Sequence, residues 1–111
     1  MERSFVGFTD GASRHTQNLA SSAWMIYTPT GQFIVLGGAC LGPTTNKVAE
    51  YSAVIELLHD AILNGILYIE VLYSELVVMQ LNGEYRVRDP IILRYYLCVR
   101  LLQQQFVYII Y

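Results

Sequence analysis

The sequence predicts an α/β domain built on a mixed five-stranded sheet. Three β-prone runs open the chain, at residues 4–9, 20–27 and 32–40, and the apolar period then changes to the three-four spacing of a helix over residues 46–63. Another β-prone run follows that helix, and a strand reached through a helix usually pairs parallel to an earlier one. Three antiparallel strands followed by parallel strands make the predicted sheet mixed.

The first half of the chain contains clear turn and cap signals. Pro29 and Gly31 lie between the second and third strands and predict a tight turn, so these strands should form an antiparallel hairpin. Thr44 or Thr45 is placed to cap the helix, and Asn64 with Gly65 should end it. We expect its apolar face at the following residues: Val48, Tyr51, Ile55, Leu58 and Ile62.

The second half predicts a short buried strand at residues 68–73 and a short helix at 74–81. Pro90 suits the first turn of another helix, which should reach about residue 104. The final run "FVYIIY" (residues 106–111) is apolar at every position, as expected for a strand that is covered on both faces. No repeat, linker or low-complexity segment interrupts the chain, so residues 1–111 are expected to form a single domain.

Composition excludes several classes of protein. Apolar residues make up 54% and charged residues only 14% of the sequence, which argues against disorder. The net charge of −2 gives no global basic field that would attract nucleic acid. Cys40 and Cys98 lack metal-ligand spacing and are interpreted as reduced thiols in the core of an intracellular protein. The sequence does not indicate the compartment. Neither a signal peptide nor a membrane-spanning run is expected.

Three motifs carry candidate chemistry: "FTDGASR" after the first strand, "TTNKVAEY" opening the main helix, and "SELVVMQLNGEYRVRDP" after the fourth strand. Over nearly the whole chain this order resembles the type 1 ribonuclease H family, in particular the short domains of plant retroelements. The resemblance implies a hydrolase that cuts RNA in an RNA/DNA hybrid with two metal ions held by four carboxylates. The first family carboxylate matches Asp10 and the second matches Glu50.

The other two carboxylates of the family pattern have no match. Tyr73 stands where the third is expected, and Glu75 is the nearest acidic residue that could reach back. The fourth belongs to a segment beyond the last strand, and this sequence stops at Tyr111, so we expect a truncated domain without the C-terminal helix. The resemblance therefore implies a degenerate, catalytically inactive site, with no cofactor, or Mg²⁺ or Mn²⁺ bound weakly at Asp10 and Glu50 if any activity remains.

Three cationic residues fall where the family contacts nucleic-acid backbone: Lys47, Arg86 and Arg88. They could bind phosphate without reading sequence, or they could be ordinary solvated residues. Asp10 and Glu50 also have interpretations without a catalytic role. Asp10 could be an ordinary residue at a strand end, and Glu50 could be a surface glutamate in the first turn of the helix, where the helix dipole favours it. His15 and His59 are expected at the surface.

Loss of the family's last helix should uncover one sheet face near the C-terminus. We therefore expect an interface at Phe106, Tyr108 and Ile110, used by a homodimer or a protein partner and not by a membrane. The preferred hypothesis is a non-catalytic interaction or dimerisation module. The alternatives are a metal-dependent endonuclease that cuts RNA in RNA/DNA hybrids and a weak nucleic-acid-binding domain.

Overall fold

The computed structural model describes residues 4–14, 19–72, 75–83 and 86–111. Its sheet has five strands in the order β3-β2-β1-β4-β5. Strands β1 (Phe5–Arg14), β2 (Leu19–Tyr27) and β3 (Phe33–Gly42) pair antiparallel, whereas β4 (Tyr68–Leu72) pairs parallel to β1 and β5 (Tyr108–Ile110) parallel to β4. The predicted mixed five-stranded sheet is confirmed.

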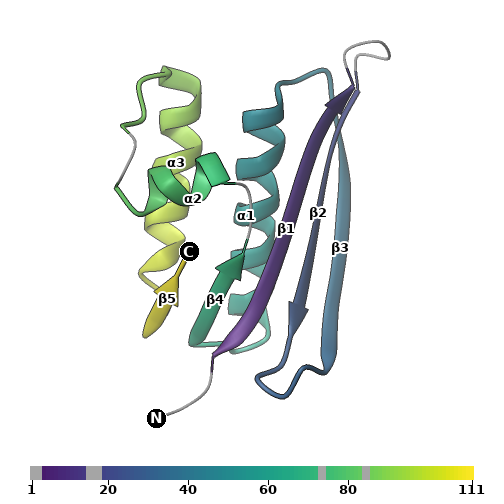
Figure 1. Cartoon of the computed structure of the whole chain (residues 1–111), viewed down its shortest axis with the longest axis vertical. Coiled ribbons are helices and arrows are strands. Elements are labelled where there is room, and N and C mark those ends of the chain that lie inside the picture. The colour runs from purple at the N-terminus through teal and green to yellow at the C-terminus, as the bar shows by residue number, and fades with distance from the viewer. Residues whose placement is uncertain (1–3, 15–18, 73–74, 84–85) are drawn as a thin grey trace.

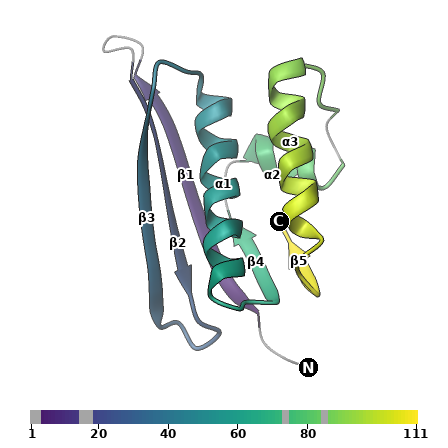
Figure 2. The same ribbon diagram turned by 180° about the vertical axis from the view of Figure 1, so that it is seen from behind.

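Three helices complete the domain: α1 (Asn46–Leu63), α2 (Glu75–Leu81) and α3 (Pro90–Gln103). Helices α1 and α3 lie side by side on one side of the sheet and begin at the same end of the molecule, the upper end in Figures 1 and 2. The Thr45 side chain caps α1 by accepting a hydrogen bond from the backbone of Val48, as predicted. Asn64 and Gly65, whose φ is 71°, end the helix.

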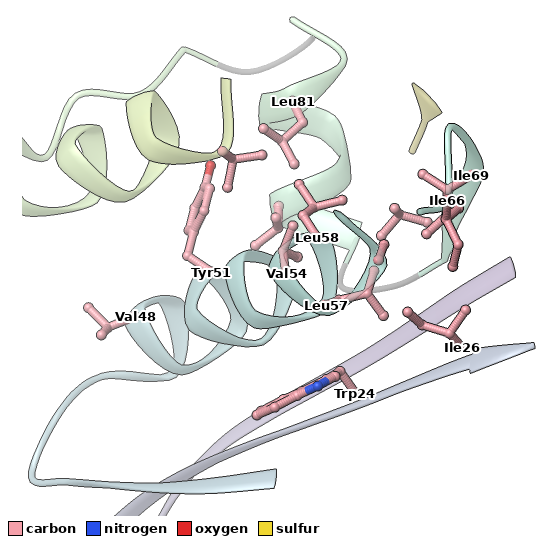
Figure 3. Close-up of a cluster of buried hydrophobic side chains, with 14 of the residues drawn as sticks. Trp24, Ile26, Val48, Tyr51, Val54, Leu57, Leu58, Ile66, Ile69 and Leu81 are labelled. Carbon is pink, nitrogen blue, oxygen red and sulfur yellow. The ribbon is translucent and has the colours of Figure 1, made fainter. Parts of the chain in front are cut away.

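The hydrophobic core lies between the sheet and the helices. Trp24 and Ile26 extend from β2 toward α1, while Tyr51 extends from α1 away from the sheet (Figure 3). The predicted apolar face of α1 was partly wrong, because Ile55 and Ile62 are only half-buried. The helix contacts the sheet on one side and α3 on another, so its buried surface is wider than one stripe.

Strand β1 is longer than predicted, which changes the setting of Asp10. This residue lies inside the strand, opposite Ala23 of β2, rather than at a strand end. The antiparallel pairing with β2 continues to Arg14, whereas the parallel pairing with β4 stops at Phe8 and Leu72. Asp10 therefore lies just beyond the carboxyl end of β4, and its side chain is exposed rather than buried.

Strand β5 is shorter than predicted and has only three residues. It pairs with a short stretch of β4, and the backbone N–H groups of Val107 and Tyr108 both donate to the carbonyl of Leu67. Val107, Tyr108 and Ile110 are exposed, so the expectation that the strand is covered on both faces was wrong.

Two further sequence predictions concern the surface. Cys40 and Cys98 are both free and exposed, so their interpretation as core thiols was wrong. His59 is exposed as expected, while His15 lies outside the described residues. In the described part of the chain, no helix combines the length and the apolar character that crossing a bilayer requires.

The two edges of the sheet differ in length. At one edge, β5 offers three residues, while at the other β3 runs for ten residues with no charged side chain. Ile34 and Leu41 have no paired residue in β2, and each forms a β-bulge near one end of β3. Leu36, between them, exposes 69% of its surface.

Candidate functional site

The candidate carboxylates lie at a direct contact between β1 and α1. Gly11 has no side chain, and a Cβ placed there would lie 2.4 Å from the backbone nitrogen of Glu50 and 2.5 Å from the carbonyl carbon of Ala49. Backbone geometry then puts the α-carbons of Asp10 and Glu50 within about 9 Å of each other. The backbones of Asp10 and Glu50, the predicted carboxylate pair, therefore lie close together although these residues are far apart in sequence.

The side chains of this pair differ in their surroundings. Asp10 is exposed and borders an apolar hollow of about 310 Å³ on the sheet, lined also by Phe8 and Leu36. Glu50 is half-buried on α1. Successive side chains of a strand alternate between faces, so Asp10 points away from the face on which Gly11 meets the helix.

The described residues do not fit a two-metal centre. Across residues 4–14, 19–72, 75–83 and 86–111, no three His, Cys, Asp or Glu side chains gather closely enough to hold a metal ion. Tyr73, predicted at the third ligand position, lies outside the described residues. Glu75 is the first residue of α2, but its side chain is not among those that the structure describes. Two divalent ions need more oxygen ligands than Asp10 and Glu50 provide.

The three predicted cationic residues do come together. Lys47, Arg86 and Arg88 line one cavity of about 460 Å³. Gln80, Asp89 and two apolar residues, Val87 and Ile92, complete its lining. Lys47 comes from the first turn of α1, and both arginines come from the segment that leads into α3. All three are exposed, so their charged groups are accessible to a ligand.

Two helix N-termini add to the positive potential of this cavity. Helix α1 begins at Asn46, so Lys47 is its second residue, and α3 begins immediately after Asp89. Both helices begin at the upper end of the molecule in Figure 1. Each N-terminus carries the equivalent of about half a positive charge. The Asp89 carboxylate is engaged in capping α3, where it accepts from the backbone nitrogens of Ile91 at 2.8 Å and Ile92 at 3.4 Å. The cavity is suited to an anion.

Gln80 is a cavity residue that the sequence analysis missed. It is the one polar side chain in the described interior of α2, and it is buried. Its Oε1 accepts a hydrogen bond of 2.6 Å from the hydroxyl of Tyr51, a fully buried residue of α1. Burial raises the pKa of Tyr51 to about 12, so the phenol remains a hydrogen-bond donor. A single glutamine among the apolar residues that follow Glu75 in this segment was the available sequence signal.

The predicted interface residues lie elsewhere, at the β5 end of the sheet. Tyr108 and Ile110 are exposed, whereas Phe106 is half-buried and packs against the core. The neighbouring Tyr111 is held in place, because its hydroxyl donates to Gln103 and its carbonyl accepts from Asn82. Burial raises the pKa of this tyrosine as well.

The chain matches the family model described as Reverse transcriptase-like over residues 8–111. It is 37% identical over 84 residues to ribonuclease HI of Halobacterium salinarum, and 34% identical over 99 residues to the bifunctional protein Rv2228c of Mycobacterium tuberculosis. These alignments cover 75% and 87% of this chain. The chain spans only 42% and 27% of the length of these two relatives.

Solved structures show the same similarity. The N-terminal RNase H domain of Rv2228c superposes with a TM-score of 0.92 at 32% identity, over 99% of this chain and 81% of that one. The Halobacterium salinarum RNase H1 structure gives 0.89 at 33% identity, over 96% and 83%. LC11-RNase H1, solved in complex with an RNA/DNA hybrid, gives 0.87 at 30% identity, over 96% and 81%.

Proposed function

Because the chain belongs to the reverse transcriptase-like family and carries a type 1 ribonuclease H-like domain, we propose that it binds RNA/DNA hybrids and does not cut them efficiently. The observation that carries the proposal is the convergence of Lys47, Arg86 and Arg88 on one cavity between two helix N-termini. A relative of the same fold was solved with an RNA/DNA hybrid, which supports hybrid as the ligand.

The binding acts on backbone phosphates. Lysine and arginine contacts to phosphate position a protein on a nucleic acid without reading its sequence. Since the whole chain carries a net charge of −2, long-range attraction is weak and affinity must come from the local cluster. Each neutralised phosphate on a duplex contributes a slope of about −0.9 to the plot of log affinity against log salt concentration. Three contacts should therefore give strongly salt-dependent binding.

The proposal of weak or absent cleavage rests on the donor set. The contact at Gly11 brings the backbones of Asp10 and Glu50 close together, and no three His, Cys, Asp or Glu side chains among the described residues gather closely enough to hold a metal ion. Tyr73 stands in the third position of the family pattern, and a phenol with a reference pKa of about 10 is a poor substitute for a carboxylate. The residues do not fit the metal pair that the family implies, so no catalytic step is assigned to them.

Binding is tested by fluorescence anisotropy of a labelled RNA/DNA hybrid over a range of salt concentrations. We expect the double substitution of Arg86→Ala and Arg88→Ala to weaken binding and to make the salt slope shallower by about 2. Arg94→Ala is a matched control, because Arg94 is exposed on α3 and does not line the cavity. Salt-independent binding, or equal losses in the double variant and the control, would contradict the proposed surface.

Cleavage is tested separately, by incubating the hybrid with the protein and Mg²⁺ or Mn²⁺. We expect no cleavage above the level of an Asp10→Asn variant. Cleavage that this substitution abolishes would show that the domain is a nuclease, and would overturn this half of the proposal while leaving the binding half intact.

A second candidate function is an interaction or dimerisation module, favoured by the apolar side chains exposed on β5. Tyr108 and Ile110 expose 45% and 39% of their surfaces. Light scattering coupled to gel filtration should then give a mass above 12.6 kDa that Ile110→Lys lowers, whereas Leu36→Lys at the opposite edge does not. A monomer at all concentrations would remove this candidate.

A further inference from the structure

Gln80 occupies an unusual place in the wall of the cationic cavity. It exposes only 6% of its surface, yet it is one of the residues that line the cavity together with Lys47 and Arg88. Polar atoms of side chains that are buried to this extent usually have at least one hydrogen-bond partner each. The carbonyl oxygen of Gln80 is satisfied by Tyr51, which leaves the two N–H donors of the amide to account for.

The buried phenol fixes which end of the amide faces the cavity. Tyr51 is fully buried, and the acceptor for its hydroxyl proton is Oε1 of Gln80 at 2.6 Å. If the amide were reversed, its NH₂ group could donate to the phenolic oxygen, but the phenolic proton would lose the acceptor that Oε1 provides. An unsatisfied buried donor is costly, so the carbonyl stays on the Tyr51 side.

The amide nitrogen is therefore available on the other side. Among the described residues, Gln80 Oε1 accepts from the hydroxyl of Tyr51, and Nε2 donates to no protein acceptor. Gln80 is one of the residues that line the cationic cavity, so the end of its side chain that faces away from Tyr51 is placed to border that cavity. A nine-tenths-buried polar group thus faces a site that already holds three cations and two helix N-termini.

We propose that the Gln80 amide donates a hydrogen bond to a backbone phosphate oxygen bound in this cavity, with Tyr51 as the positioning residue that holds the amide in that orientation. This inference rests on the proposed function, since it names a binding residue within the same surface. Lysine acts as a point charge and places a phosphate only loosely, whereas an amide in a fixed rotamer is directional. Gln80 would fix where the phosphate sits between the cations.

A neutral donor and a cation leave different thermodynamic signatures. Each lysine or arginine contact releases counterions and adds to the salt dependence of binding. An amide carries no charge, so its loss should lower affinity by the same factor at every salt concentration. The salt slope therefore separates the role of Gln80 from the role of Arg86 and Arg88.

The test measures anisotropy of a labelled RNA/DNA hybrid with the full chain. We expect Gln80→Met, which keeps the length of the side chain and removes its donors, to weaken binding about tenfold, equivalent to about 1.4 kcal/mol, with an unchanged salt slope. Arg88→Ala should instead make the slope shallower by about 1. Gln105→Met is the control, because Gln105 is exposed beyond the end of α3, and it should leave affinity unchanged.

The orientation is tested by nuclear magnetic resonance and by Tyr51→Phe. In the wild-type protein, the side-chain NH₂ resonances of Gln80 should shift when inorganic phosphate or hybrid is added. Tyr51→Phe frees the amide to rotate, so these shifts should shrink and affinity should fall by a smaller factor than in Gln80→Met. This readout needs no variant of Gln80, and it stands even if Gln80→Met fails to fold.

Failure of this inference is distinguishable from failure of the proposed function. If the wild-type protein shows no salt-dependent hybrid binding, the proposed function is wrong and the inference falls with it. If the wild type binds and Arg88→Ala weakens it, but Gln80→Met binds normally and the amide resonances do not move, only the inference is wrong. A changed salt slope in Gln80→Met would mean displaced cations, and would equally overturn a donor role.

Discussion

Replacing Gly11 with alanine should destabilise the domain strongly, because β1 and α1 touch backbone to backbone at this position. The added methyl carbon would lie 2.4 Å from the nitrogen of Glu50, and 2.5 Å and 2.7 Å from the carbonyl carbon and oxygen of Ala49. Ordinary carbon contacts are about 3.5–4.0 Å. The two elements must therefore move apart by an ångström or so, since neither backbone has a rotamer that could give way.

The magnitude follows from the cost of overpacking. An extra methyl group in a close-packed site costs about 1–3 kcal/mol, and we expect the upper end here because the clashing atoms are backbone atoms. One kcal/mol shifts the melting temperature of a domain of about this size by roughly 4 °C. The Gly11→Ala protein should therefore melt about 10 °C below the wild type in a thermal scan followed by circular dichroism.

Gly38→Ala provides the matched control. Gly38 lies in β3 of the same sheet, and its added Cβ would meet only the carbonyl oxygen of Ser22, at an ordinary 3.6 Å. Neither glycine has a positive φ, so backbone strain does not enter the comparison. The control should melt within about 2 °C of the wild type. If both variants melt alike, the close approach of β1 and α1 is not a constraint, and the placement of Glu50 beside Asp10 loses its support.

Three other perturbations test separate parts of the structure. Trp24→Phe removes the 2.6 Å hydrogen bond from the indole nitrogen to the carboxylate of Asp60 and should lower the free energy of unfolding by about 1.5–3 kcal/mol in a urea titration; an unchanged midpoint would contradict this bond. The pKa of Tyr51 is raised to about 12, chiefly by burial, so the folded state resists its ionisation, and the contribution to stability should be complete below pH 10 and decline as pH rises toward 12. Stability measured across that range should fall less in Tyr51→Phe than in the wild type, and parallel curves would argue against the burial. Cys40 and Cys98 are both exposed, so a thiol reagent should label two groups in the native protein as fast as in urea, and slow native labelling would contradict their positions.

Local signals were enough to predict α1 and the hairpin of β2 and β3. Thr45 can cap a helix, Asn64 and Gly65 can end one, and each acts within one turn of its own position, so the bounds of α1 were predicted correctly. The turn between β2 and β3 was equally local, with Gly31 at a φ of 89°.

Tertiary pairing explains most of what was missed in the fold. The segment from Asp10 to Arg14 includes residues of low β-propensity, so nothing local predicted a strand there. It is extended because β2 runs beside it. Cys40 and Cys98 are exposed because each lies on a face of its element that no other part of the protein covers. Composition alone does not predict which faces are covered.

In the candidate site too, some residues could be predicted from the sequence and others depend on tertiary contacts. Similarity to a known family indicated Lys47, Arg86 and Arg88, and the structure supplied the cavity that they share. Gln80 had no local motif, because its role depends on the hydroxyl of Tyr51, a residue from another helix and 29 positions away in the chain. The expected interface at Tyr108 and Ile110 stays a prediction.

The long edge strand β3 has a consequence for how concentrated solutions of the protein should behave. An uncharged edge can accept an extra strand from a neighbouring molecule, and such strands can propagate into fibres. Here the bulges at Ile34 and Leu41 leave only about six regular residues between them, or roughly 20 Å of strand. The middle of that stretch is Gly37 and Gly38, which have no side chains to interdigitate with another sheet. We therefore expect reversible turbidity that clears on dilution, rather than persistent fibrils.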